Sequence, residues 1–236
     1  MEIKVLASGS KGNCYYISDG VSPVLIECGL PWKQIQQTLE FRTSDIGAVL
    51  VSHEHKDHCK AFKDVMKAGI DLYASPGTIK ALSMTGHRVK PVNALEKFMV
   101  GNWAILPFRA EHDAAGSLGF LLSSKSGEKL LYATDTFYLR YRFNGLTHIM
   151  VECNYSMDIL RENVRSKTVD AEMKNRIVRS HFSLGNVKDF LRANDLSKVR
   201  EIHLLHLSDN NSDEVVFKRE IQALTGKPVY IAGEQG

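Results

Sequence analysis

Short apolar runs alternate with polar turns along most of the chain, which predicts a strand-rich domain with helices between strands. Helical patterns separate several of these runs, so we expect a mixed α/β fold in which helices cover the sheets. Strands are predicted at residues 3–7, 14–18, 24–27, 48–52, 72–74, 103–109, 117–123, 129–133, 148–152, 201–207 and 228–232. Helices are predicted at residues 31–40, 60–68, 75–84, 186–193 and 213–224.

The composition is that of an ordinary soluble globular protein. The chain has 236 residues, of which 44% are hydrophobic and 24% are charged, enough to build a sizeable core. No Pro- or Ser-rich linker, low-complexity tract or internal repeat interrupts it, so we expect a single domain over residues 1–236. The net charge of +3 does not select a class of partner.

The N-terminal residues and the cysteines indicate a cytoplasmic protein. The start of the chain lacks the basic residues and long apolar core of a signal peptide, and no apolar run reaches membrane-spanning length. The four cysteines form no CxxC pair, so we expect reduced and mostly buried thiols. They are Cys14, Cys28, Cys59 and Cys153.

Three histidines and one aspartate crowd into the stretch His53-Glu-His-Lys-Asp-His58, directly after a predicted strand. His53 and His55 are two positions apart, so they share a face if the backbone is extended. Asp57 and His58 are adjacent and can diverge toward a second point. One segment can therefore supply ligands to two metal ions.

Further ligand candidates follow other predicted strands, where binding groups usually lie. His112, Asp135 and His206 can complete the two ligand sets, with Asp135 as the bridge. Two metal ions roughly 3.5–4 Å apart would clamp the oxygens of a phosphoryl displacement and activate a hydroxide at neutral pH. Imidazole and carboxylate ligands favour zinc, and manganese also suits them.

Two simpler interpretations compete with this hypothesis. One is a histidine-rich surface loop, which the H-x-H-x-D-H spacing and the strand-end ligands disfavour. The other is a non-catalytic metal site, which is disfavoured because structural zinc sites are mostly cysteine-rich and closed.

The stretch His53–His58 resembles the signature of the metallo-β-lactamase fold superfamily, and the likeness extends along most of the chain. The segments Ala7-Ser-Gly-Ser-Lys-Gly-Asn-Cys-Tyr-Tyr, Leu25-Ile-Glu-Cys-Gly-Leu, Ala133-Thr-Asp-Thr and His206-Leu-Ser-Asp-Asn-Asn resemble its YycJ/WalJ-type branch, which is related to ribonuclease Z. The resemblance implies an αββα sandwich, two mixed β-sheets flanked by helices, with a dinuclear site at one edge of the sheets.

The resemblance also implies a ligand assignment. His53, His55 and His112 would hold one metal ion, and Asp57, His58 and His206 the other, with Asp135 bridging. An aspartate in place of a bridging cysteine points toward phosphodiesterases. Relatives often carry Asp where this chain has Glu27, an acid that would orient the metal-binding loop; a solvent-facing Glu27 is the alternative.

Phosphodiester cleavage also needs a proton donor for the leaving alkoxide. His181 resembles the extra histidine of ribonuclease Z-type enzymes, and we expect it to act as general acid or phosphate clamp. Glu152 resembles the acidic strand end that orients this histidine. The alternatives are a helix-capping neighbour for His181 and no catalytic duty for Glu152. Asp57 joins these catalytic candidates because its loss should abolish hydrolysis.

Substrate contacts are expected just after two of the metal ligands. Residues 137–143 interleave aromatics with Arg140 and Arg142, a combination that grips phosphates and stacks bases. Ser208 and Asn210, beside His206, are further candidates. Residues 161–179 add six basic residues against three acidic ones. Half-buried aromatics and a solvated helix face remain the ordinary interpretation of these segments.

The leading hypothesis is a metal-dependent phosphodiesterase, specifically a DNA or RNA exonuclease. Three alternatives stay open: a phosphodiesterase for small cyclic nucleotides, a thioester or lactone hydrolase, and a non-catalytic metal-stabilised module that binds nucleic acid. We expect no membrane partner. The sequence leaves open whether the chain forms a homodimer.

Overall fold

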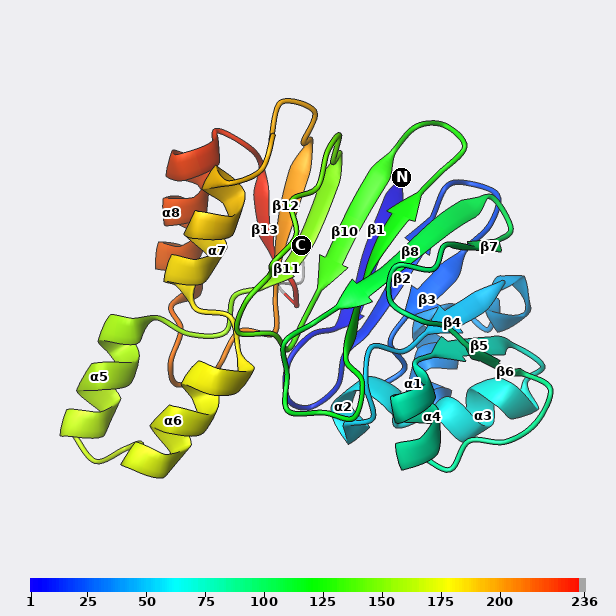
Figure 1. Cartoon of the computed structure of the whole chain (residues 1–236), viewed down its shortest axis with the longest axis horizontal. Helices are drawn as coiled ribbons and strands as arrows, with labels where there is room; N and C mark the ends of the chain where they lie inside the picture. The colour runs from blue at the N-terminus through cyan, green and yellow to red at the C-terminus, as the bar shows by residue number, and fades with distance from the viewer. Residues whose placement is uncertain (234–236) are drawn as a thin grey trace. The chain divides into compact units, whose positions relative to one another are not determined.

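The computed structural model describes residues 1–233, which form two compact units (Figure 1). Unit 1 comprises Met1–Arg109 and Ala114–Glu128, and unit 2 comprises Ala110–Asp113 and the described residues from Lys129 onward. The single domain expected over residues 1–236 stays a prediction.

Unit 1 contains a six-stranded mixed sheet whose strands follow each other in chain order. The first three strands are antiparallel, and the last four, which share β3 with them, run parallel. The strands are β1 (Glu2–Ala7), β2 (Cys14–Ser18), β3 (Val24–Ile26), β4 (Ala48–Leu50), β5 (Asp71–Ala74) and β6 (Val89–Pro91). The parallel half needs crossover connections, which the helices of this unit supply.

The helices of unit 1 are α1 (Trp32–Thr38), α2 (Lys56–Cys59), α3 (Phe62–Lys67) and α4 (Pro76–Ala81), with a short 3-10 turn at Thr43–Asp45. Ile35 of α1 and Val65 of α3 pack with strand residues such as Val49 in one buried apolar cluster. Three further strands, β7 (Phe98–Val100), β8 (Trp103–Arg109) and β9 (Leu118–Ser123), pair antiparallel in this unit.

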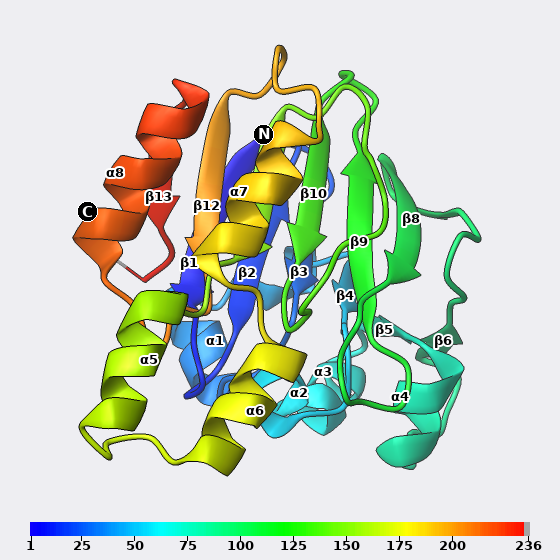
Figure 2. The same ribbon diagram turned by 60° about the vertical axis from the view of Figure 1, so that its left-hand side comes forward.

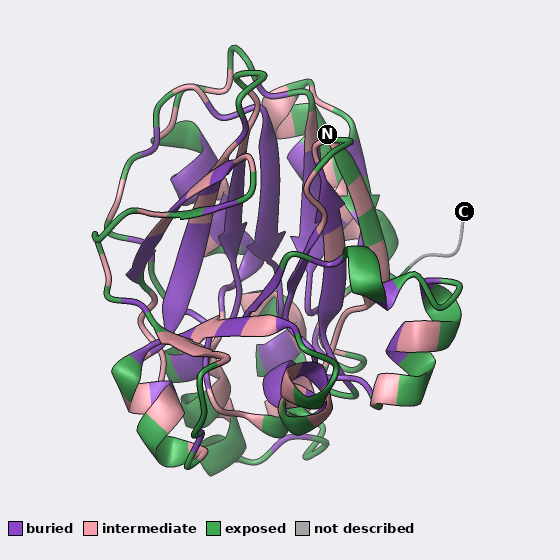
Figure 3. Ribbon diagram, turned by 90° about the vertical axis from the view of Figure 1, so that its right-hand side faces the viewer, coloured by how far each residue is buried: buried purple, intermediate pink, exposed green. Residues whose placement is uncertain are grey.

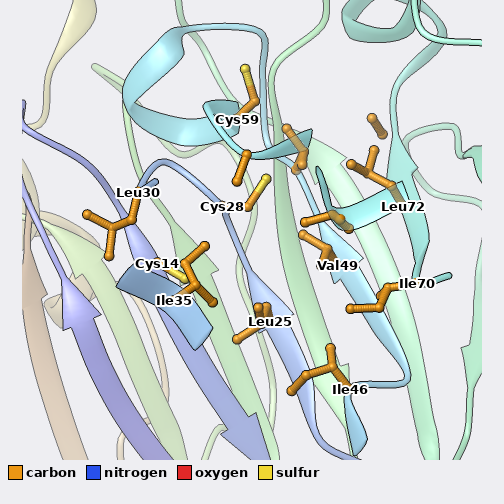
Figure 4. Close-up of a cluster of buried hydrophobic side chains, with 14 of the residues drawn as sticks. Cys14, Leu25, Cys28, Leu30, Ile35, Ile46, Val49, Cys59, Ile70 and Leu72 are labelled. Atoms are coloured by element: carbon orange, nitrogen blue, oxygen red, sulfur yellow. The ribbon is translucent and has the colours of Figure 1, made fainter. Parts of the chain in front are cut away.

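Three of the four thiols lie in that apolar cluster (Figure 4). Cys14, Cys28 and Cys59 are buried and form no disulfide. The same is true of Cys153 in unit 2. Burial, reinforced by nearby carboxylates, raises the pKa of Cys59 to about 12, so this thiol stays protonated at neutral pH. The predicted buried, reduced thiols are confirmed, and the metal-ligand candidates remain histidines and carboxylates.

Unit 2 is built on four parallel strands, β10 (Lys129–Ala133), β11 (His148–Glu152), β12 (Glu201–Leu205) and β13 (Val229–Ile231). Their sequences are nearly continuous apolar runs, as expected for parallel strands covered on both faces. Helices α7 (Leu184–Arg192) and α8 (Glu214–Thr225) lie beside β12 and β13 (Figure 2). Helices α5 (Met157–Arg165) and α6 (Ala171–Ser180) pack on each other around Leu160 and Val169.

Most predicted strands are confirmed, several of them to the residue, including 103–109, 129–133 and 148–152. The predictions missed helix α2 and the three-residue strands β6 and β7. For residues 161–179 they gave a solvated helix face without bounds, where the structure has the two helices α5 and α6. Residues 137–143 form no regular element. In each unit the strands are mainly buried, whereas the helices alternate buried and exposed positions (Figure 3). Within residues 1–233, no helix is long and apolar enough to cross a membrane.

Candidate metal-binding and catalytic residues

In unit 1 the candidate ligands begin where two parallel strands end side by side. Ile26 of β3 pairs with Leu50 of β4, and the next amide, that of Glu27, donates to the Leu50 carbonyl at 2.8 Å. Glu27 then adopts a left-handed backbone with φ of 65°, which costs energy for a non-glycine residue and is typical of functional sites. Its buried carboxylate accepts the Ser52 amide, each oxygen lying 3.3 Å from that nitrogen. Glu27 is therefore not solvent-facing.

His53 and His55 point their rings to the same side, as the alternation of an extended backbone predicts. Nε2 of His53 lies 3.1 Å from Nδ1 of His55, while Nδ1 of His53 bonds the Ser52 hydroxyl at 2.8 Å. The intervening Glu54 accepts the Ala115 amide at 2.7 Å instead. Two nitrogens bound to one tetrahedral zinc ion at about 2.05 Å would be roughly 3.3 Å apart, so this pair is spaced to share an ion.

Asp57 and His58 lie in the single turn α2, and other polar groups hold the His58 ring. Nε2 of His58 is 3.3 Å from Oδ2 of Asp57 and 3.2 Å from the side-chain amide nitrogen of Asn13. Its Nδ1 is 3.5 Å from Oε1 of Glu27. Glu27 thus contacts a predicted metal ligand and accepts the Ser52 amide of the metal-binding loop, which fits the orienting role expected for the aspartate of relatives.

Asn13 is a site residue that sequence reasoning overlooked. It is fully buried, and its own amide donates to the Asp57 carbonyl at 2.7 Å. Its signal was present in residues 8–13, whose glycines and serines mark a loop between two predicted strands. Gly29 completes this packing, since a Cβ placed there would lie 1.7 Å from the Asp57 carbonyl oxygen.

In unit 2 three acidic or imidazole side chains follow three neighbouring parallel strands. Asp135, Glu152 and His206 come at or just after the carboxyl ends of β10, β11 and β12, the edge where α/β sheets bind ligands. Asp135 and His206 both adopt left-handed backbone conformations, with φ of 43° and 52°. Ligand atoms of Asp135, Glu152, His181 and His206 all lie within 4.8 Å of one another.

Glu152 is the hub of this group. Its Oε1 is 2.6 Å from Nδ1 of His181 and 3.2 Å from Nδ1 of His206. Its Oε2 accepts the backbone amides of Thr136 and Phe182 at 3.1 and 3.2 Å. Burial alone would raise the pKa of Glu152, but the charge and hydrogen bond of His181, together with a hydrogen bond to His206, outweigh burial and hold that pKa below its ordinary value.

His181 is the C-terminal cap of α6 and stands between α6 and α7, three residues before the start of α7. Burial opposes its protonated form, but the Glu152 carboxylate, with a smaller contribution from Asp135, outweighs burial and raises the pKa of His181. Because Nδ1 faces this carboxylate, Nδ1 carries a proton and Nε2 is the nitrogen that can exchange one with a substrate.

His112 is held by the backbone of the same unit. Its Nδ1 lies 3.2 Å from the Ser180 carbonyl, which can only accept, so Nδ1 is the donor and Nε2 keeps its lone pair. That Nε2 is 3.9 Å from Oδ2 of Asp135. The tautomer therefore suits the predicted role of His112 as a metal ligand through Nε2.

These donor sets fit divalent metal ions. Each unit offers imidazole nitrogens and carboxylate oxygens within ligating distance of one another, and oriented by further hydrogen bonds. The buried, protonated thiols take no part. Within unit 1 the structure brings together His53, His55, Asp57 and His58, and within unit 2 it brings together His112, Asp135, Glu152, His181 and His206.

The residues predicted to contact the substrate differ in exposure and in hydrogen-bond partners. Nε of the exposed Arg140 donates to Oε1 of Glu111 at 2.6 Å, and Arg142 is exposed. The Ser208 hydroxyl accepts from the Asn211 amide at 3.3 Å, so it also serves its own loop. Asn210 is exposed. Of the other histidines, His148 and His203 are buried near Glu201, away from the candidate ligands of unit 2.

Comparison with known proteins defines the family. The model of the β-lactamase superfamily domain matches residues 23–206, which is more than half of the chain. The chain is 28% identical to the exodeoxyribonuclease WalJ of Streptococcus pneumoniae over 226 residues, covering 88% of this chain and 82% of that protein. It is also 28% identical to the exodeoxyribonuclease YycJ of Bacillus anthracis over 246 residues, covering 96% and 90%.

The fold comparison agrees. The metallo-β-lactamase fold protein YhfI of Bacillus subtilis matches with a TM-score of 0.74 at 16% identity, covering 98% of this chain and 95% of that one. This likeness confirms the predicted fold class, an α/β fold of two mixed sheets flanked by helices. The chain belongs to the β-lactamase superfamily and is a metal-dependent hydrolase.

Proposed function

We propose that the chain is a metal-dependent exodeoxyribonuclease in which His181, held by Glu152, protonates the leaving oxygen. The observation that carries this proposal is the 2.6 Å contact between Nδ1 of His181 and Oε1 of Glu152, beside Asp135. A buried carboxylate fixes the ring and supports its protonated form, which is what a general acid at neutral pH requires.

The substrate class comes from the relatives. WalJ and YycJ are both named exodeoxyribonucleases, and each is covered over most of its length. DNA is therefore the leading substrate, ahead of RNA and of the cyclic-nucleotide, thioester and lactone alternatives. The aromatic and arginine residues at 137–143 support a polynucleotide, because rings stack on bases and guanidinium groups bind phosphates.

We propose two metal ions, zinc or manganese, bound by the predicted ligands. The sharing of ions between His53, His55 and His112, and between Asp57, His58 and His206, with Asp135 bridging, rests on the family resemblance. When bound, such ions stabilise charge on the phosphoryl oxygens and supply a nucleophile at neutral pH. The chain's own residues then have separable tasks: Glu27 and Asn13 orient His58, Glu152 holds His181, and His181 passes its Nε2 proton to the departing oxygen.

A cleavage assay tests this proposal. Chelator-treated protein, reloaded with zinc or manganese, is incubated with end-labelled single- and double-stranded DNA and RNA and with 3′,5′-cyclic nucleotides. We expect progressive shortening of DNA from one end. Asp57→Ala should abolish it, whereas Asp64→Ala should not, since Asp64 lies on the outer surface of α3 beside Lys67.

The other outcomes are equally informative. Opening of cyclic nucleotides with intact polymers would replace the exonuclease by the small-substrate enzyme. Full cleavage by Asp57→Ala would remove Asp57 from the catalytic machinery. If removal of the metal lowers the thermal stability but the metal-loaded wild type hydrolyses no substrate, the non-catalytic binding module is favoured.

A further inference from the structure

We infer that a hollow in unit 2, between residues 138–142 and α7, binds the terminal base of the DNA strand. The inference rests on the proposed function and names the part of the substrate that this surface recognises. The hollow has a volume of about 300 Å³. That is the lower end of the ~300–1,000 Å³ range of small-molecule sites, which suits one nucleoside rather than a longer stretch of chain.

The lining of the hollow has the chemistry of a base-binding site. Tyr138 and Tyr141 contribute aromatic rings from the loop, and Phe182 and Phe190 contribute apolar surface from the other wall. Tyr138 is 56% exposed, so its ring is available to stack on a base. Stacking tolerates every base, as an exonuclease requires.

Polar groups occupy the same wall as the apolar surface. Asn186 and Asp189 of α7 both line the hollow. The Asn186 amide nitrogen donates to the Phe137 carbonyl at 2.9 Å, which leaves its oxygen as an acceptor. Amide and carboxylate oxygens can receive the amino and imino hydrogens on base edges, while Arg142 supplies positive charge for the attached phosphate.

The loop that forms one wall is already ordered for binding. The Thr136 hydroxyl donates to the Tyr138 carbonyl at 2.8 Å, and the Phe143 amide donates to Oδ1 of Asn194 at 2.7 Å. Arg140 is tied to Glu111. A wall fixed in this way loses little conformational entropy when a ligand binds.

The two walls are linked to the proposed acid. Thr136 and Phe182, which border the loop and α7, both donate their amides to Oε2 of Glu152. The other oxygen of Glu152 holds His181, the residue directly before Phe182. Phe182 lines the hollow and shares Glu152 with His181, so the contacts of one carboxylate link the base site to the proposed acid and couple recognition of the strand end to cleavage of its first phosphodiester bond.

The test measures base binding without turnover. Deoxyribonucleoside monophosphates are titrated into metal-free full-length protein and followed by tyrosine fluorescence and calorimetry. We expect Tyr138→Ala to weaken binding about 5- to 100-fold and Tyr138→Phe to retain it. Tyr230→Ala, at another exposed tyrosine of unit 2, should leave binding unchanged.

A second measurement uses oligonucleotides whose terminal nucleotide carries a base or is abasic. With metal-loaded protein, Tyr138→Ala should raise KM for the normal end but not for the abasic end. Tyr230→Ala, the control outside the hollow, should match the wild type on both ends.

The outcomes separate this inference from the proposed function. If the wild type degrades DNA but Tyr138→Ala matches it in both measurements, the base site is overturned while the nuclease stands. If the wild type leaves DNA intact yet binds monophosphates through Tyr138, the base site stands and the exonuclease fails. Equal KM values of the wild type for normal and abasic ends would also overturn the base site.

Discussion

Nδ1 of His181 lies 2.6 Å from Oε1 of Glu152 in unit 2. The two residues come from the cap of α6 and the end of β11, elements separated by α5, so their contact is a product of folding. The buried Glu152 carboxylate contacts two backbone amides and two imidazole rings. These contacts fix the His181 ring and leave Nε2 as the nitrogen that can exchange a proton.

The first prediction concerns leaving groups. His181→Ala should slow DNA cleavage about 10²- to 10⁴-fold, because an alkoxide must be protonated as it departs. Hydrolysis of bis-p-nitrophenyl phosphate should fall far less, since nitrophenolate leaves without an acid. Steady-state rates on both substrates, with metal content measured by atomic absorption, check this. His87→Ala, at an exposed histidine, serves as the control, and equal slowing on both substrates would exclude His181 as the acid.

The second prediction concerns Glu27. Glu27→Gln removes the charge that faces Nδ1 of His58, so metal affinity should fall about 10- to 100-fold. Glu27→Asp keeps the charge and tolerates the left-handed backbone, and should lose less affinity. Competition with a chromogenic chelator measures the affinities, with the exposed Glu40→Gln as the control. Identical affinities for all four proteins would contradict this role.

The third prediction concerns the close approach of Gly29 to Asp57. Gly29→Ala forces the backbone of residues 57–58 to move. The substitution should lower the free energy of unfolding by about 1–3 kcal/mol, as overpacking does, and it should also lower the affinity for metal ions. Gly185→Ala is the control, because its Cβ would meet only the Ser183 hydroxyl at 3.6 Å, within a helix that favours alanine. Urea unfolding measures the free energy of unfolding of both variants. An unchanged midpoint for Gly29→Ala would show that the loop adjusts without cost.

The fourth prediction concerns pH. A hydrogen bond from His203 lowers the pKa of Glu201 below 4.5, so the ionised carboxylate stabilises the fold above pH 4.5 and loses that effect as pH falls through its folded-state value. Glu201→Gln should therefore cost about 1 kcal/mol at pH 7, and this difference from wild type should shrink below pH 4.5. Thermal unfolding across pH 3.5–7 measures it. The exposed Glu172→Gln is the control, and a difference that grows toward low pH would contradict the assignment.

The fifth prediction concerns salt. If DNA phosphates contact Arg142, Arg142→Ala should reduce the slope of log K against log salt by about 0.7 for single strands. Binding of a labelled oligonucleotide by the cleavage-deficient Asp57→Ala protein measures the slope. Arg140→Ala should change it less, because Glu111 already neutralises Arg140. The control is Arg219→Ala, an exposed arginine of α8, and a slope unaffected by Arg142→Ala would place the strand elsewhere.

The tertiary structure supplied elements that the sequence pattern hid. The sequence of residues 161–179 is interpreted as a solvated helix face without bounds. The structure divides this region into α5 and α6, which begin at the side-chain caps Ser156 and Asp170 and are held together by a small apolar cluster. Strands β6 and β7 have three residues each, too few for alternation to be visible. Helix α2 is a single turn whose polar sequence carries no helical period.

By itself the sequence determined the ligand chemistry. The spacing of His53, His55, Asp57 and His58 is local, and so is the sequence of apolar runs that places Asp135, Glu152 and His206 at strand ends. Only the tertiary structure decided which atoms meet: Asn13 and Glu27 on His58, Ser180 on His112, and Glu152 on His181 and His206. The physical reason is that period and spacing determine which side of an element a residue faces. The orientation of each side chain within the site depends instead on contacts between segments far apart in the chain. It also depends on backbone conformations, such as that of Glu27, that are stable only when those contacts form.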